Sequence, residues 1–161
     1  MTPQERNQFI ERIAPWARFS QEKYGVPASV TLAQAILESN WGKSLLAAKY
    51  NNFFGIKDSQ LSNDGYAELP TTEVENGNVR SIRARFEAFA DPQRAFDCHA
   101  RLLARLPRYK PAMADADDPF VFAARVQECG YSTDPAYAKK LVDVITANKL
   151  TRFDAPKKAG S

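Results

Sequence analysis

The chain has 161 residues, 44% of them hydrophobic and 25% charged, which is the size and composition of one globular domain with a real core. Its formal net charge of +3 is mildly basic. The cations are scattered along the chain, apart from Arg80, Arg83 and Arg85 and a short basic tail, and this argues against a nucleic-acid partner. Two cysteines, Cys98 and Cys129, without metal-ligand spacing exclude a disulfide scaffold and predict free buried thiols, and no segment reaches transmembrane length.

The first two segments predict helices, and the second carries a candidate catalytic acid. Thr2-Pro3 opens a helix with apolar residues at helical spacing up to Tyr24, and Gly25 ends it. Pro27 opens a second helix, whose apolar stripe predicts burial along its length. Glu38 lies at the end of this helix, where a carboxylate opposes the negative end of the helix dipole, so its pKa is expected to rise. A polar residue that breaks local rules in this way indicates function. The alternative, which position alone favours, is an ordinary exposed glutamate at a helix end.

Residues 50–66 are rich in Asn, Gly, Ser and Asp and predict irregular structure that lines a site. A hairpin follows. Residues 69–74 are β-prone, Asn76-Gly77 is a strong two-residue turn signal, and residues 79–89 alternate apolar and polar side chains.

Three similar starts predict three short packed helices in the rest of the chain. Each start is an Asp-Pro pair, at residues 91–92, 118–119 and 134–135. We therefore expect an α+β, mainly α, fold with helices around a long buried helix and a small β-hairpin lobe flanking a cleft. Residues 1–153 form its single domain, and the polar residues 154–161 form a flexible tail.

Elimination leaves carboxylates as the working groups. The sole histidine, His99, lies on an apolar helix face, which favours a packed core histidine over a base or a metal ligand. Cys98 points to a different side of that helix from His99, so a thiol mechanism lacks its base. No glycine-rich phosphate loop follows a strand, and no cluster requires a metal, so we expect no cofactor. Glycosidic bond cleavage needs a protonated carboxyl group beside the leaving oxygen, a role that Glu38 fits.

Four motifs in order give the chain a specific resemblance. They are residues 33–43 (AQAILESNWGK), 51–57 (NNFFGIK), 71–73 (TTE) before the Asn-Gly turn, and 130–141 (GYSTDPAYAKKL). Together they resemble glycoside hydrolase family 73, the N-acetylglucosaminidases of autolysins and flagellar rod-cap hydrolases, from about residue 26 to about residue 150. The resemblance implies a lysozyme-like fold and an endo-β-N-acetylglucosaminidase that cleaves peptidoglycan between GlcNAc and MurNAc.

The resemblance also implies three catalytic residues. Glu38 is the general acid, Glu73 on the hairpin is the second carboxylate, and Tyr131 stands near the reacting sugar. A one-step register error would move the second role to Glu68 or Glu75. A two-residue turn also puts Glu73 opposite Arg80 on the partner strand, so a cross-strand ion pair is an alternative role for Glu73.

Candidate substrate-binding residues surround the acid in the sequence or lie in the last motif. They are Trp41, Tyr50, Asn51, Asn52, Phe53, Phe54 and Tyr137. The aromatic rings are suited to stacking on sugar faces or to desolvating Glu38, and the amides to binding sugar hydroxyl or acetamido groups. Packing and loop bracing are the alternatives for these residues, as packing is for Tyr131.

The expected partners are peptidoglycan glycan strands, with no nucleic acid, no membrane insertion and a monomeric chain. The first residues lack the positive start and apolar run of a secretory signal, so we expect synthesis in the cytoplasm and action on the wall after export, injection or lysis. A phage lysin, a secreted effector and an autolysin domain remain open, and we expect no covalent enzyme intermediate. The alternative functions are a muramidase or lytic transglycosylase on the same fold, and a non-catalytic wall-binding or assembly protein.

Overall fold

Two N-terminal helices begin and end where local signals predict. In the computed structural model, which describes residues 1–58 and 64–156, α1 spans Pro3–Tyr24 and α2 spans Ala28–Ser39. Thr2 and Glu5 form a reciprocal capping box at the start of α1, and Gly25 ends the helix with a left-handed φ of 84°. Both ends are therefore fixed by residues next to them in the sequence.

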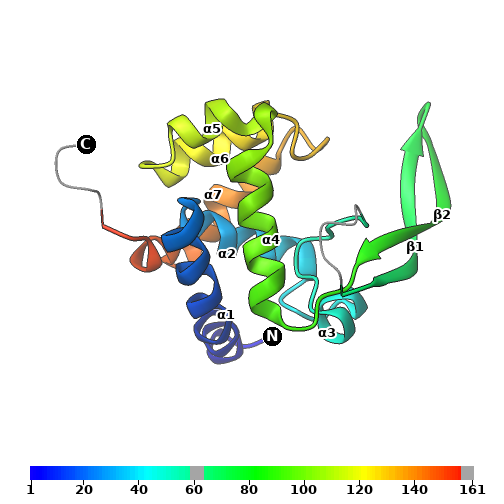
Figure 1. The fold of residues 1–161 in the computed structure, drawn as a ribbon, viewed down its shortest axis with the longest axis horizontal. Helices are drawn as coiled ribbons and strands as arrows, with labels where there is room; N and C mark the ends of the chain where they lie inside the picture. Colours follow the sequence, from blue (N-terminus) through cyan, green and yellow to red (C-terminus); the bar gives the residue numbers. More distant parts are fainter. Residues whose placement is uncertain (59–63, 157–161) are drawn as a thin grey trace.

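The centre of the molecule is α2. Its residues 28–36 are all buried, because α1, α6, α7 and a C-terminal 3-10 turn pack around it. In Figure 1, α4 crosses in front of α2, the α5, α6 and α7 helices lie above it, and α1 lies below. Burial ends at the last turn of α2, where Glu38 becomes exposed. Glu38 therefore lies at the surface, at the end of a helix that is otherwise mostly buried.

The later helices largely follow the predicted starts. Asp91 and Asp118 cap α4 (Pro92–Arg105) and α6 (Pro119–Glu128), as predicted. The third prediction is wrong by two residues: α7 spans Tyr137–Ala147, and the Asp134 side chain accepts a hydrogen bond from Ala136 N in a turn before it. The sequence analysis missed α3 (Leu45–Tyr50), α5 (Lys110–Ala114) and the 3-10 turns η1 (Pro107–Tyr109) and η2 (Leu150–Phe153).

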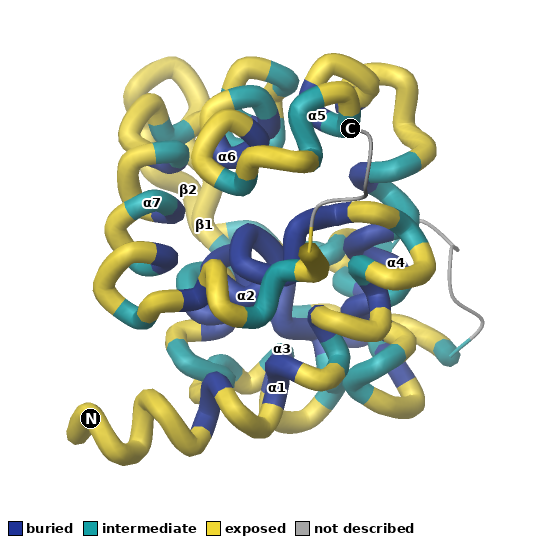
Figure 2. The backbone as a smooth tube through the Cα atoms, turned by 90° about the vertical axis from the view of Figure 1, so that its left-hand side faces the viewer, coloured by how far each residue is buried: buried dark blue, intermediate teal, exposed yellow. Residues whose placement is uncertain are grey.

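The β-hairpin is the lobe that projects at the right of Figure 1. It pairs β1 (Tyr66–Glu75) with β2 (Asn78–Glu87), and both turn residues, Asn76 and Gly77, have positive φ, as a type I′ turn requires. Val74 and Val79 near the tip are 74% and 71% exposed, whereas Ala67 at the base is buried. The buried residues of the hairpin thus lie at its base, whereas most of its other residues are exposed, drawn yellow in Figure 2. The α+β, mainly α, fold is confirmed.

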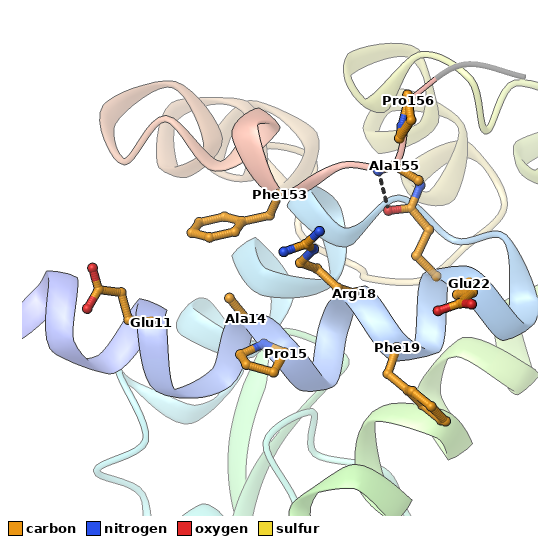
Figure 3. A pocket seen from close by; sticks show the side chains of 10 residues that line it. Glu11, Ala14, Pro15, Arg18, Phe19, Glu22, Phe153, Ala155 and Pro156 are labelled. Carbon is orange, nitrogen blue, oxygen red and sulfur yellow. Dashed lines mark hydrogen bonds between the residues drawn. The ribbon is translucent and has the colours of Figure 1, made fainter.

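The start of the predicted tail is held against the body of the protein. Asp154 accepts hydrogen bonds from the backbone N and the hydroxyl of Ser29, both 2.7 Å long. Ala155 N donates to the Gln21 side chain at 3.0 Å, the dashed line in Figure 3, beside a groove on α1 that both residues line. These bonds group Asp154 and Ala155 with the folded domain, whereas the predicted tail residues 157–161 lie outside the described residues.

The two cysteines are free, as predicted, but only Cys98 is buried, and Cys129 is partly exposed. Within residues 1–58 and 64–156, no helix is long and apolar enough to cross a membrane.

Candidate active site

A cleft opens where the end of α2 meets the 54–57 loop, α4 and η1. Its volume is about 380 Å³. Its surface is polar and apolar in nearly equal parts, and one acid and two cations lie among the lining side chains. Its lining consists of Glu38, Phe54, Gly55, Ile56, Lys57, His99, Leu102, Leu103, Leu106, Arg108, Tyr109 and Tyr131.

Glu38 is the single carboxylate among the lining residues. The helix stops directly after it because Asn40 adopts a left-handed conformation, with φ of 48°. The Glu38 side chain reaches solvent through the cleft, yet the protein packed around it raises its pKa by burial. The hydroxyl of Tyr137 donates to Glu38 Oε1 at 3.3 Å and opposes part of this rise. The expected upward pKa shift is present, with burial as its main cause.

Three tyrosines surround the acid. Tyr137, the first residue of α7, is buried and also accepts a hydrogen bond from Gln34 Nε2 at 3.3 Å. Tyr131 stacks on Tyr137 with 5.6 Å between ring centroids, and Tyr109 packs beside Tyr131 at 6.3 Å. Burial raises the pKa of Tyr131 and of Tyr137 well above the ordinary tyrosine value. Both phenols are therefore neutral at physiological pH and present O–H groups.

His99 forms part of the cleft wall and is a core residue, as predicted. Its ring stacks on Phe54 with centroids 4.0 Å apart, and burial lowers its pKa to about 3. Neither ring nitrogen has a hydrogen-bond partner within the described part of the chain. The imidazole is therefore uncharged at neutral pH. In the same part of the chain, no three His, Cys, Asp or Glu side chains gather as metal ligands do.

The second predicted carboxylate lies on the hairpin and outside the cleft lining. Glu73 is opposite Arg80 in the strand register, as predicted, but the ion pair between them, the alternative role for Glu73, is not observed. Arg80 pairs instead with Glu75 at 2.9 Å, and Glu73 pairs with Lys57 at 3.5 Å. Because Lys57 itself lines the cleft, this contact connects Glu73 to the site.

Three of the predicted sugar-binding aromatic residues do not line the cleft. Trp41 and Phe53 pack against Phe9, with ring centroids 5.9 and 6.5 Å apart. Tyr50 ends α3, and its carbonyl accepts a hydrogen bond from Phe89 N. The rings of Trp41 and Phe53 are part of the core or its edge. Of the predicted aromatic set, Phe54 lines the cleft and Tyr137 reaches it through Glu38.

The two asparagines brace the loop rather than face the cleft. The buried Asn52 amide donates to the carbonyls of Ile56 and Glu87 and accepts from Phe54 N and Ile56 N. Asn51 donates to a carbonyl at the end of the hairpin, that of Phe89. Their hydrogen-bonding groups hold the 51–57 loop against the base of the hairpin, which was the alternative role considered from the sequence.

The sequence analysis missed several residues of the site. Lys57, Arg108 and Tyr109 line the cleft, and Gln34 reaches the acid through Tyr137. The sequence did contain a signal for Gln34. Its amide lies within the apolar stripe of α2, one turn before Glu38, where a polar group does not stabilise the fold. The cations gave no signal, since any exposed Lys or Arg looks the same in a sequence.

Comparison with known families gives one extensive match. The family model described as mannosyl-glycoprotein endo-beta-N-acetylglucosaminidase matches residues 14–150. Among curated proteins, exo-glucosaminidase LytG of Bacillus subtilis is 38% identical over 155 residues, which cover 93% of this chain and 54% of LytG. Peptidoglycan hydrolase FlgJ of Salmonella typhimurium is 36% identical over 141 residues, which cover 85% of this chain and 44% of FlgJ. The chain thus spans about half the length of these relatives.

Solved structures agree with this match. The catalytic domain of the autolysin Auto from Listeria monocytogenes superposes with a TM-score of 0.84 at 31% identity, over 96% of this chain and 90% of that domain. A C-terminally truncated glycoside hydrolase domain of Salmonella typhimurium FlgJ gives a TM-score of 0.73 at 35% identity, over 89% of this chain and 97% of that domain.

Proposed function

We propose a function from one established premise: this chain belongs to the glucosaminidase family, glycoside hydrolase family 73. Membership confirms the resemblance and the lysozyme-like fold that the sequence indicated. The protein is a glycoside hydrolase that cuts the glycan strands of peptidoglycan between GlcNAc and MurNAc, as an endo-β-N-acetylglucosaminidase. In this proposal it acts on the cell wall as a monomer.

The observation that carries this proposal is the environment of Glu38. A carboxyl group whose pKa is raised by burial keeps its proton at a higher pH than an ordinary glutamate, and this one faces a cleft. In the reaction Glu38 gives that proton to the glycosidic oxygen while the bond from C1 to this oxygen breaks. A water molecule then adds to C1 and gives its proton to a carboxylate, either the second acid or Glu38, which is now ionised.

Glu73 is the second carboxylate in this proposal. Three glutamates of β1 are candidates, and their ion pairs differ: Glu68 pairs with Arg83 and Glu75 with Arg80, both partners on β2, whereas Glu73 pairs with a residue of the cleft. That contact supports Glu73 as the group nearest to the bound glycan. Its role is to act on the attacking water or on the positive charge that develops at C1, without a covalent enzyme intermediate.

The charge of the cleft supports an anionic polymer as substrate. Lys57 and Arg108 line the same cleft as Glu38, and Arg108 is held above the Tyr109 ring at 4.7 Å. Peptidoglycan strands carry peptide carboxylates along the glycan, which cations at a cleft attract. Tyr131 contributes its hydroxyl near the reacting sugar.

The test is digestion of purified peptidoglycan, followed by borohydride reduction and mass spectrometry of the fragments. Wild type is expected to produce reduced GlcNAc ends, and Glu38→Gln to lose activity by about 100-fold or more, the usual contribution of a general acid. Early release of long fragments supports endo cleavage, whereas release of single terminal sugars moves the assignment to exo cleavage. Muramic or anhydro-muramic ends would instead assign a muramidase or a lytic transglycosylase.

Matched variants on one strand test the second carboxylate. Glu73→Gln is expected to lower kcat far more than Glu68→Gln or Glu75→Gln, because each of the controls loses only a surface ion pair with an arginine of β2. Equal activity of the three variants would remove Glu73 from the mechanism.

A further inference from the structure

A buried hydrogen-bond chain runs from the core of α2 to the acid. Gln34 is fully buried, and its Nε2 donates to the Tyr137 hydroxyl at 3.3 Å. That hydroxyl donates in turn to Glu38 Oε1 at 3.3 Å. Gln34 and Glu38 are four residues apart on α2 and so share one face of the helix, with Tyr137 of α7 bridging them.

We propose that Gln34 is a positioning residue for the acid: its amide holds the Tyr137 hydroxyl in the orientation in which it donates to Glu38. This inference rests on the proposed function, in which Glu38 is the proton donor. Gln34 touches neither the substrate nor the carboxyl group, and it acts through Tyr137.

The direction of the chain follows from the number of protons. A phenol has one O–H to donate and an oxygen that accepts. Because Gln34 donates to this oxygen, the phenol proton is left for Glu38 Oε1. In the protonated acid, the proton then sits on Oε2, which receives no hydrogen bond from the described residues. The acid proton is therefore free to reach the glycosidic oxygen rather than being held by Tyr137.

Other groups near Glu38 do not provide this control. Tyr137 is the one group among the described residues that hydrogen-bonds to the carboxyl group. The remaining titratable or charged groups that line the cleft are neutral His99 of α4, Tyr109 and Arg108 of η1, Lys57 of the 54–57 loop and Tyr131 before α7. The orientation of one hydroxyl thus decides which carboxyl oxygen carries the proton.

Gln34→Met keeps the length of the side chain and removes the donor. The Tyr137 oxygen is then free to accept the acid proton of Glu38, which stabilises the protonated form. We expect the pKa of Glu38 to rise by about half a unit, because hydrogen bonds of this length are weaker than ideal ones. The kcat is expected to fall about tenfold, since the proton points away from the substrate, while KM changes less than about twofold.

Two further variants separate this effect from loss of folding. Thr31→Val is the matched control, because Thr31 is equally buried on α2, one turn before Gln34, and its hydroxyl has no partner in the described part of the chain. It is expected to leave the kcat and the Glu38 pKa unchanged. In a Tyr137→Phe background, Gln34→Met is expected to have no additional effect on either quantity, since the group through which Gln34 acts is gone.

The experiment combines a carboxyl titration with kinetics. The Glu38 side-chain carbon is followed by ¹³C NMR against pH in wild type and the variants without substrate, and is assigned by its loss in Glu38→Gln. A raised pKa in Gln34→Met that disappears in the Tyr137→Phe background supports the inference. Titration curves of Gln34→Met and wild type that coincide would overturn it, as would an equal shift in Thr31→Val. Because the titration needs no substrate, it remains decisive even when digestion assays reject the glucosaminidase activity itself.

Discussion

His99 is predicted to limit the stability of the protein in mild acid. The folded protein holds the imidazole neutral, with its pKa lowered to about 3 by complete burial, whereas an unfolded chain protonates it near the ordinary value of 6.5. The unfolded state thus binds more protons between these two pH values, so stability is lost as the pH falls from about 6.5 toward 3. At pH 5 this linkage costs about 2 kcal/mol relative to pH 7.5, because the unfolded histidine titrates 1.5 units above pH 5.

The perturbation is His99→Phe, which keeps an aromatic ring on Phe54 and removes the titrating group. His99 is the sole histidine of the chain, and the carboxyl groups titrate alike in both proteins, so the difference between them isolates its contribution. Urea unfolding at pH 7.5 and pH 5, followed by circular dichroism, measures that difference. The variant is expected to gain about 2 kcal/mol relative to wild type on going to pH 5, a midpoint shift of about 1 M urea. A difference that stays constant with pH would refute a neutral, buried imidazole.

Three other predictions concern contacts that connect distant segments. Asp154→Ala is expected to lower the free energy of unfolding by about 1–2 kcal/mol in urea denaturation, because its carboxylate caps the first turn of α2 through Ser29, and Asp154→Asn by less. Asn52→Ala is expected to lower the free energy of unfolding by about 3 kcal/mol in the same assay, because its buried amide makes four hydrogen bonds. Asn51→Ala breaks one hydrogen bond and is expected to cost about 1 kcal/mol. Equal losses would argue against the role of Asn52 in holding the 51–57 loop. Arg108→Gln is expected to raise KM several-fold for peptide-bearing glycan and to leave KM unchanged for glycan stripped of its peptides, because Arg108 attracts the peptide carboxylates. Equal changes in KM for the two substrates would argue against this role of Arg108.

Local sequence was sufficient for α1, α2, α4, α6 and the hairpin, but not for the short helices α3 and α5. The capping box of α1, the Asn76-Gly77 turn and the Asp91 cap each depend on residues within a few positions of one another, so the chain shows them directly. Glu38 became the candidate acid through the motif at residues 33–43, because its place at the end of an apolar stripe alone favours an ordinary exposed glutamate. The start of α7 was misplaced because Asp134 can cap a turn as readily as a helix.

The partners of the site residues depended on packing between distant segments. Proximity in sequence suggested Trp41, Phe53 and the asparagines as neighbours of the acid, but the fold uses these side chains in the core and the loop. The residues that contact Glu38 or share its cleft come from α4, η1 and α7, far along the chain.

The sequence by itself therefore determined the longer helices, the hairpin, its register and Glu38 as the candidate acid, because periodicity, caps and turns act over a few residues. Only the tertiary structure decided that Tyr137 hydrogen-bonds to Glu38 and Gln34 to Tyr137, that Lys57 rather than Arg80 pairs with Glu73, and that Asp154 caps α2. The physical reason is that burial and hydrogen bonding at these positions depend on contacts between segments distant in the sequence. Those contacts form only when the helices pack together.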